Sequence, residues 1–103
     1  MSKLYRQGDV LIEQIAEIPR SAKRSKGKIV LAHGEATGHA HTIEDRDSAD
    51  WWVLPDGEQQ YLEVAKGAEV VHQEHSTIAL PAGRYRVTRQ REYSPEAIRV
   101  MAD

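Results

Sequence analysis

The sequence predicts one all-β domain, a small antiparallel barrel or sandwich that spans residues 1–103 and ends in a short C-terminal helix. Three observations lead to this fold class. Short apolar segments recur along the chain, glycine and proline turns separate them, and only the tail has a helical pattern. A chain of 103 residues closes one hydrophobic core and is too short for a second.

The first half of the chain predicts three strands. Residues 9–15 form the first, which ends before Pro19 because proline cannot donate to a sheet. Residues 20–28 carry five basic side chains and are expected to be a solvated loop. The next two strands are predicted at residues 28–32 and 37–44.

The second half begins with a polar loop at residues 44–50 and continues with a predicted hairpin. Residues 51–54 and 58–64 flank Pro55-Asp56-Gly57, where proline fixes φ and Asp-Gly tolerates a positive φ. Two further strands are expected at residues 69–80 and 84–91, with turns at residues 66–67 and 81–83.

The tail predicts the C-terminal helix. Ser94 is a suitable N-cap, Pro95 fits the first helical position and Glu96 places an acid in the first turn. A small apolar stripe follows, made of Ala97, Ile98, Val100 and Met101. The expected role of this helix is to cover one open end of the β core.

Composition limits the possible functions. No stretch reaches the length of a membrane span, and the N-terminus has no apolar signal core, so a cytoplasmic protein without membrane contact is expected. The chain has no cysteine, which excludes disulfides and thiolate zinc sites and leaves imidazole and carboxylate as metal ligands. The net charge of −2 gives no overall attraction to nucleic acid.

Four of the five histidines form two tight clusters, and ordinary core building does not require them. Residues i and i+2 of a strand share a face, so His39 and His41 would present two imidazoles side by side. In the second cluster, His72 and Glu74 would share a face, unless a bulge turned His75 inward in place of Glu74. Both pairings fit the sequence.

This pattern predicts a site for a divalent metal ion, zinc, iron, nickel or manganese, with His39, His41, His72 and His75 as candidate ligands. Glu74 and His75 are the candidate catalytic residues if the protein is an enzyme. Glu35 and Glu44 flank the first cluster and are spare acids that would ligate the metal or orient a histidine. His33 has no partner at ligand spacing and is left out.

The residues Gly34, His39, His41 and Glu44, followed by Pro81 and Gly83, resemble the motifs of the cupin superfamily. That resemblance covers about the middle half of the chain and implies a small β-barrel with a metal bound by a His-x-His pair, a glutamate and a later histidine. Two features depart from the pattern: Glu44 follows His41 too closely, and no histidine comes after the Pro-x-Gly segment. The resemblance therefore does not assign the chain to the cupin superfamily.

Two other functions use the same sequence features. Two histidines acting as general base and general acid would cleave a phosphodiester without metal, and His75-Ser76-Thr77 matches half of the corresponding His-x-Thr motif. A non-catalytic module would bind nucleic acid or a small anionic ligand through its basic side chains, with Trp51 or Trp52 stacking on a base. The arginines that would contact phosphates are Arg84, Arg86, Arg89 and Arg91.

Overall fold

A computed structural model describes residues 3–33, 39–55 and 59–89 of the chain. Within these ranges the elements are almost all strands, joined by one short 3₁₀ helix, which confirms the all-β prediction. The elements are β1 (Leu4–Gln7), β2 (Val10–Ile15), β3 (Lys23–Ser25), β4 (Ile29–His33), β5 (Ala40–Ile43), η1 (Arg46–Ser48), β6 (Ala49–Val53), β7 (Gln59–Val70) and β8 (Ile78–Arg89).

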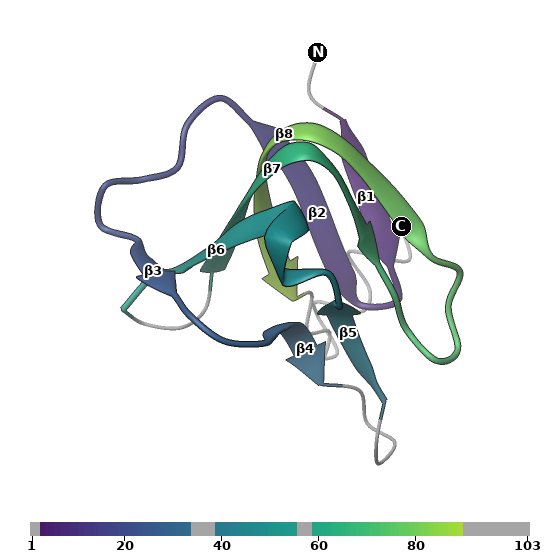
Figure 1. Cartoon of the computed structure of the whole chain (residues 1–103). Helices are drawn as coiled ribbons and strands as arrows, with labels where there is room; N and C mark the ends of the chain where they lie inside the picture. The colour runs from purple at the N-terminus through teal and green to yellow at the C-terminus, as the bar shows by residue number, and fades with distance from the viewer. Residues whose placement is uncertain (1–2, 34–38, 56–58, 90–103) are drawn as a thin grey trace, which may run out of the picture.

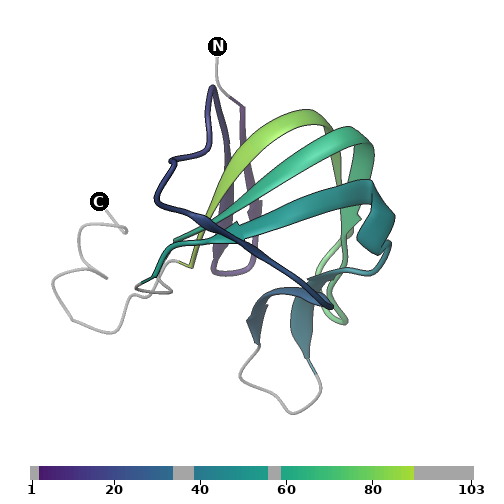
Figure 2. The ribbon, with the colours of Figure 1, turned by 60° about the vertical axis from the view of Figure 1, so that its left-hand side comes forward.

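The strands form a curved six-stranded sheet and a separate two-stranded one, in which every strand pairing between described residues is antiparallel. The large sheet has the order β1-β2-β8-β7-β6-β3, and β4 pairs with β5 (Figure 1). Figure 2 shows β6, β7 and β8 arching side by side. Because β1 and β3 stand at opposite ends of the order, the described strands do not close into a barrel.

The core follows the two-residue alternation of the strands. Val10 and Ile12 of β2 are fully buried, as are Leu62 of β7 and Tyr85 of β8, while their sequence neighbours Leu11 and Glu13 are partly exposed. The two-stranded sheet joins the same core through Ile29, Leu31 and Ile43. One hydrophobic cluster therefore holds both sheets together.

The prediction of turns at residues 66–67 and 81–83 was wrong. Both segments lie within one long hairpin of β7 and β8, where Gly67 pairs with Pro81 and Val64 pairs with Gly83. The register shifts between Val64 and Gly67 because β7 has one residue more than β8 there. A bulge is a position where a strand tolerates proline and glycine, so these residues bend the hairpin and do not end it.

Other boundaries also differ from the prediction. The predicted strand at residues 69–80 is interrupted, because β7 ends at Val70 and β8 begins at Ile78. Strand β1 was not predicted, the expected loop at 20–28 contains the short β3, and the expected loop at 44–50 contains η1. The predicted C-terminal helix lies outside the described residues. No helix in the described ranges is long and apolar enough to cross a membrane.

Candidate functional site

The four clustered histidines come together at one end of the long hairpin. His41 lies in β5 and His39 directly precedes it, whereas His72 and His75 lie in the loop between β7 and β8. The ring centroid of His72 lies 4.3 Å from that of His41, 4.6 Å from that of His75 and 5.7 Å from that of His39. The rings of His41 and His75 are stacked at 5.9 Å.

The loop between β7 and β8 explains why the second cluster contributes more side chains than either expected pairing included. Both pairings assumed a strand at residues 69–80, so one of them brought in Glu74 without His75 and the other used a bulge to bring in His75 without Glu74. Because residues 71–77 leave the strand geometry, apart from a single bridge at Val71, both imidazoles reach the cluster. Glu74 also reaches it, through His39.

Backbone hydrogen bonds hold β5 against this loop. Thr42 and Val71 exchange two of them, with N···O distances of 3.0 and 2.9 Å. The side-chain oxygen Oε1 of Gln73 accepts a third from the Ala40 amide at 2.9 Å. The two histidine-bearing segments are thus fixed to each other on both sides of His41.

Gln7 at the end of β1 determines how His41 is protonated. Both side chains are 2% exposed. The Gln7 amide nitrogen Nε2 donates to the carbonyls of Val70 and Ser76 at 3.0 and 2.9 Å, so Oε1 is the atom that faces His41 Nδ1 at 2.7 Å. An amide oxygen only accepts, so His41 carries a proton on Nδ1, and the lone pair of the neutral ring is on Nε2.

The Nε2 atom of His41 faces a carboxylate that the sequence analysis did not select. Asp9 Oδ1 lies 3.6 Å from it, and the other oxygen, Oδ2, accepts a hydrogen bond from Arg89 Nε at 2.8 Å. Burial alone would raise the pKa of Asp9, but the hydrogen bond and charge of Arg89 outweigh burial and lower it. Asp9 is therefore ionised at neutral pH.

Two imidazoles of the cluster are held neutral. Burial, followed by the charge of His72, lowers the pKa of His41 from 6.5 to about 4, although Asp9 acts in the opposite direction. The pKa of His72 is also lowered, first by desolvation and then by His75 and His39. At neutral pH these two rings carry lone pairs and no charge.

Glu74 holds two histidines in different ways. Its carboxylate oxygen Oε1 lies 2.8 Å from His39 Nδ1, and a carboxylate only accepts, so this nitrogen of His39 is the donor. Its backbone amide donates to His72 Nδ1 at 3.0 Å, which places the proton of neutral His72 on Nε2. Glu74 itself is exposed, and its interactions are those of an orienting group.

Gly8 brings the turn between β1 and β2 close to the cluster. Its φ of +59° belongs to the left-handed region, which glycine adopts without strain. A Cβ at this position would lie 2.8 Å from His75 Nε2 and 3.4 Å from His41 Cε1. A side chain here would collide with the site.

The rings gather, but their donor atoms do not all point to one place. In the described ranges, no three histidine, aspartate or glutamate side chains are already arranged to hold a metal ion. The pair formed by His41 and Asp9 is fixed by buried partners, whereas His75 is exposed on its loop. The cluster thus has one rigid side and one adjustable side.

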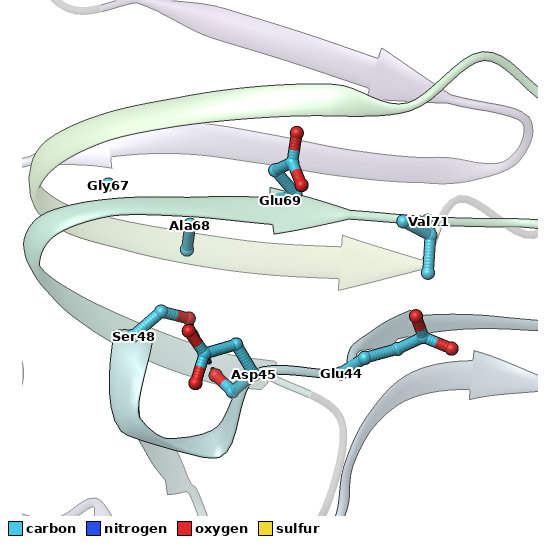
Figure 3. Close-up of a pocket in the computed structure, with 7 residues that line it drawn as sticks. All are labelled: Glu44, Asp45, Ser48, Gly67, Ala68, Glu69 and Val71. Atoms are coloured by element: carbon cyan, nitrogen blue, oxygen red, sulfur yellow. Dashed lines mark hydrogen bonds between the residues drawn. The ribbon is translucent and has the colours of Figure 1, made fainter.

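The other residues selected from the sequence lie elsewhere. Glu35 and Gly34 are outside the described residues. Glu44 lines a separate open pocket of about 420 Å³ with Asp45 and Glu69, shown in Figure 3. Pro81 and Gly83 lie inside β8 and form no turn, so the strand arrangement lends no support to the cupin resemblance.

The arginines of β8 are engaged with carboxylates. Arg84 pairs with Glu63 at 2.9 Å, Arg86 pairs with Glu13, and Arg89 pairs with Asp9. Arg91 lies outside the described residues.

The two adjacent tryptophans of β6 have different surroundings. Trp51 packs on the core and donates to Gln60 Oε1 at 2.8 Å, while Trp52 lies on β6 with an indole nitrogen that is buried and has no hydrogen-bond partner. Trp52 also lines a pocket beside Arg20 and Arg84, away from the histidines.

Comparison with known proteins gives a family but no function. No curated protein and no solved structure matches the chain. Residues 6–90, most of the chain and all the described side chains of the cluster, match one protein family. The chain belongs to that family, which is described as "Domain of unknown function (DUF8820)".

Proposed function

We propose that this protein binds one divalent metal ion in the histidine cluster. The observation that carries the proposal is the way two of the imidazoles are oriented. His41 and His39 each donate Nδ1–H to an oxygen, on Gln7 and Glu74 respectively, which leaves Nε2 as the ligating atom. Metal-binding histidines in proteins show this arrangement, because the acceptor fixes both the tautomer and the direction of the ring.

His72 and His75 would complete the site from its adjustable side. Both belong to the loop between β7 and β8, and His75 is exposed, so rotation of its side chain requires no change in the core. His72 would bind through Nε2 once its proton has moved to Nδ1, a change that breaks the present hydrogen bond from the Glu74 amide to Nδ1. Imidazole ligands without thiolate suit zinc, iron, nickel or manganese.

The metal-free reading has less support. Of the imidazoles in the cluster, His75 of the His-x-Thr segment is exposed, but His41 is 2% exposed and could not serve as its acid–base partner on a phosphodiester. A phosphodiester must also meet cations, whereas Arg84, Arg86 and Arg89 are bound to carboxylates. The same ion pairs weaken the case for a nucleic-acid-binding module, since a phosphate would have to displace a carboxylate from each arginine. A small anionic ligand held by the metal itself needs no such exchange.

The test is metal stoichiometry, measured by elemental analysis and by titration with zinc on protein purified without a histidine tag. The wild type should bind one ion, and the double variant His39→Ala/His75→Ala should bind it at least about tenfold more weakly, because it lacks two imidazoles of the cluster. His33→Ala is the matched control, since His33 is an exposed histidine on β4.

Both substituted residues of the double variant lie outside the buried core, so the fold should survive, as circular dichroism will show. A folded wild type that takes up no zinc, iron, nickel or manganese would overturn the proposal. Equal affinity in the double variant would do the same.

A further inference from the structure

We propose that Asp9 is a ligand of this ion and binds it through Oδ1, opposite Nε2 of His41. This inference rests on the proposed function and adds a carboxylate to a site that the sequence indicated only by its histidines. It follows from hydrogen-bond geometry at the two atoms.

Nε2 of His41 and Oδ1 of Asp9 are both atoms that can bind a metal ion. Nδ1 of His41 donates to the oxygen of the buried Gln7 amide, so Nε2 is the ring nitrogen left to ligate, and Arg89 Nε binds Asp9 through Oδ2. The two atoms face each other at 3.6 Å, which is too long for a hydrogen bond. A cation between them would bind both, because imidazole nitrogen and carboxylate oxygen are common metal ligands.

The separation of these atoms fits a shared ion. A zinc ion about 2.0–2.2 Å from a nitrogen and an oxygen, with a tetrahedral angle at the metal, sets those two atoms roughly 3.4 Å apart. The observed 3.6 Å requires a shift of a few tenths of an ångström. A direct hydrogen bond would require a larger movement in the same direction.

Neighbouring groups hold Asp9 in this position. Arg89 of β8 binds Oδ2 at 2.8 Å and leaves Oδ1 directed at His41. Gly8 allows the turn to approach the imidazoles, since the position of its missing Cβ is 2.8 Å from His75 Nε2. Asp9 thus lies beside His41 and next to Gly8, whose backbone approaches His75, and the three segments are separate in the chain.

A carboxylate changes which ions the site prefers. A set of imidazoles with one carboxylate suits zinc, iron(II) or manganese(II) and disfavours copper(I), which prefers sulfur ligands. The carboxylate also reduces the charge of the occupied site by one unit. Both effects distinguish this site from one built of histidine alone.

Cobalt(II) is the probe for the experiment, because its absorption spectrum reports the type and number of its ligands. Asp9→Asn should bind cobalt at least about tenfold more weakly than the wild type and should shift the visible bands. Glu13→Gln is the matched control, because Glu13 also pairs with an arginine of β8 but does so away from the histidines. It should bind cobalt as the wild type does.

Arg89→Gln separates ligation from the ion pair. It removes the group that positions Asp9 and keeps the carboxylate, so cobalt affinity should fall while the bands of the saturated protein stay those of the wild type. A second measurement needs no variant: in the wild type, cobalt should broaden or shift the Asp9 carboxyl carbon resonance far more strongly than that of Glu13.

The outcomes distinguish this inference from the proposed function. If the wild type binds no cobalt and no zinc, the metal site itself is refuted. If the wild type binds cobalt while Asp9→Asn keeps the same affinity and spectrum, Asp9 is no ligand and the histidine site stands. An Asp9 carboxyl resonance unmoved by bound cobalt would overturn the inference in the same way.

Discussion

The two ends of the β7–β8 hairpin are built by different physical means. At one end, Leu62, Tyr85 and Val87 are fully buried and belong to the hydrophobic cluster that includes Val10 and Ile12 of β2, so the transfer of apolar surface from water holds the strands. At the other end, the loop at 71–77 is held by directed hydrogen bonds with Gln7, Thr42 and Ala40. The first end determines stability, and the second determines where donor atoms lie.

The largest expected effect belongs to the apolar end. Leu62→Ala should lower the free energy of unfolding by about 2–5 kcal/mol, because it leaves a cavity in the core. The measurement is urea denaturation followed by circular dichroism. At temperatures where this variant is still folded, its zinc affinity should match the wild type. A parallel loss of affinity would show that the two ends are coupled.

The histidine end should make the metal-free protein sensitive to acid. The unfolded chain protonates His41 near pH 6.5, whereas the folded chain does so only near pH 4. Between these values the unfolded state binds more protons, so stability is complete above pH 6.5 and falls as the pH approaches 4. The loss should be on the order of 3 kcal/mol, with His72 acting in the same direction.

Urea titrations in chelator at several pH values measure this effect. His41→Gln should flatten the dependence, and His33→Ala should leave it unchanged. Stability that stays constant from pH 7 to pH 4 in the wild type would contradict a buried, neutral His41.

Gln7→Leu tests both roles of the Gln7 side-chain amide, as the acceptor for His41 and as the donor to two backbone carbonyls. It removes the acceptor of His41 Nδ1–H and leaves the carbonyls of Val70 and Ser76 without a donor. The unsatisfied groups should lower stability by about 1–3 kcal/mol. Zinc affinity should fall by about 10–100-fold, since the imidazole is no longer oriented. Thermal unfolding and zinc titration give both values, and unaltered affinity would remove Gln7 from the site.

The smallest effect is expected at Gly8. Gly8→Ala and Gly27→Ala each place a side chain at a positive φ and should lose about 1–2 kcal/mol from backbone strain alone. Nothing lies within 4 Å of the missing Cβ of Gly27, whereas that of Gly8 would meet His75. Zinc titration of the two variants isolates the contact: weaker binding is expected in Gly8→Ala only. Equal binding would show that His75 is free to move away.

The sequence predicted the apolar end better than the polar one, and the reason is the range of the interactions. The apolar patterns of residues 9–15, 51–54 and 84–91 are local, and the described parts of these segments overlap β2, β6 and β8. Strand β1 has an exposed Leu4 and a buried Gln7, the reverse of what side-chain polarity predicts. Pro81 reads as a turn because sequence alone does not show the extra residue opposite it.

Within the site, the sequence indicated the four histidines because they stand in pairs. It did not indicate Gln7 or Asp9, which lie more than 30 residues before His41 and follow no motif. A signal was present in Gln-Gly-Asp, a turn with two polar residues directly before an apolar strand. The position of Gln7 and Asp9 beside the imidazoles depends on the register of β1 on β2 and of β2 on β8, which the sequence does not show.

The Gln7 amide also has a consequence for the order of events during folding. Its two donor bonds join residues 63 and 69 positions apart in the chain. Contacts of such long range form slowly, because the intervening chain must first be closed into a loop. The hairpin of β7 and β8 can assemble without the N-terminal strand, but the imidazole of His41 acquires its direction only when that strand has docked. Metal uptake would thus be a late event, one that marks the completed fold and does not nucleate it.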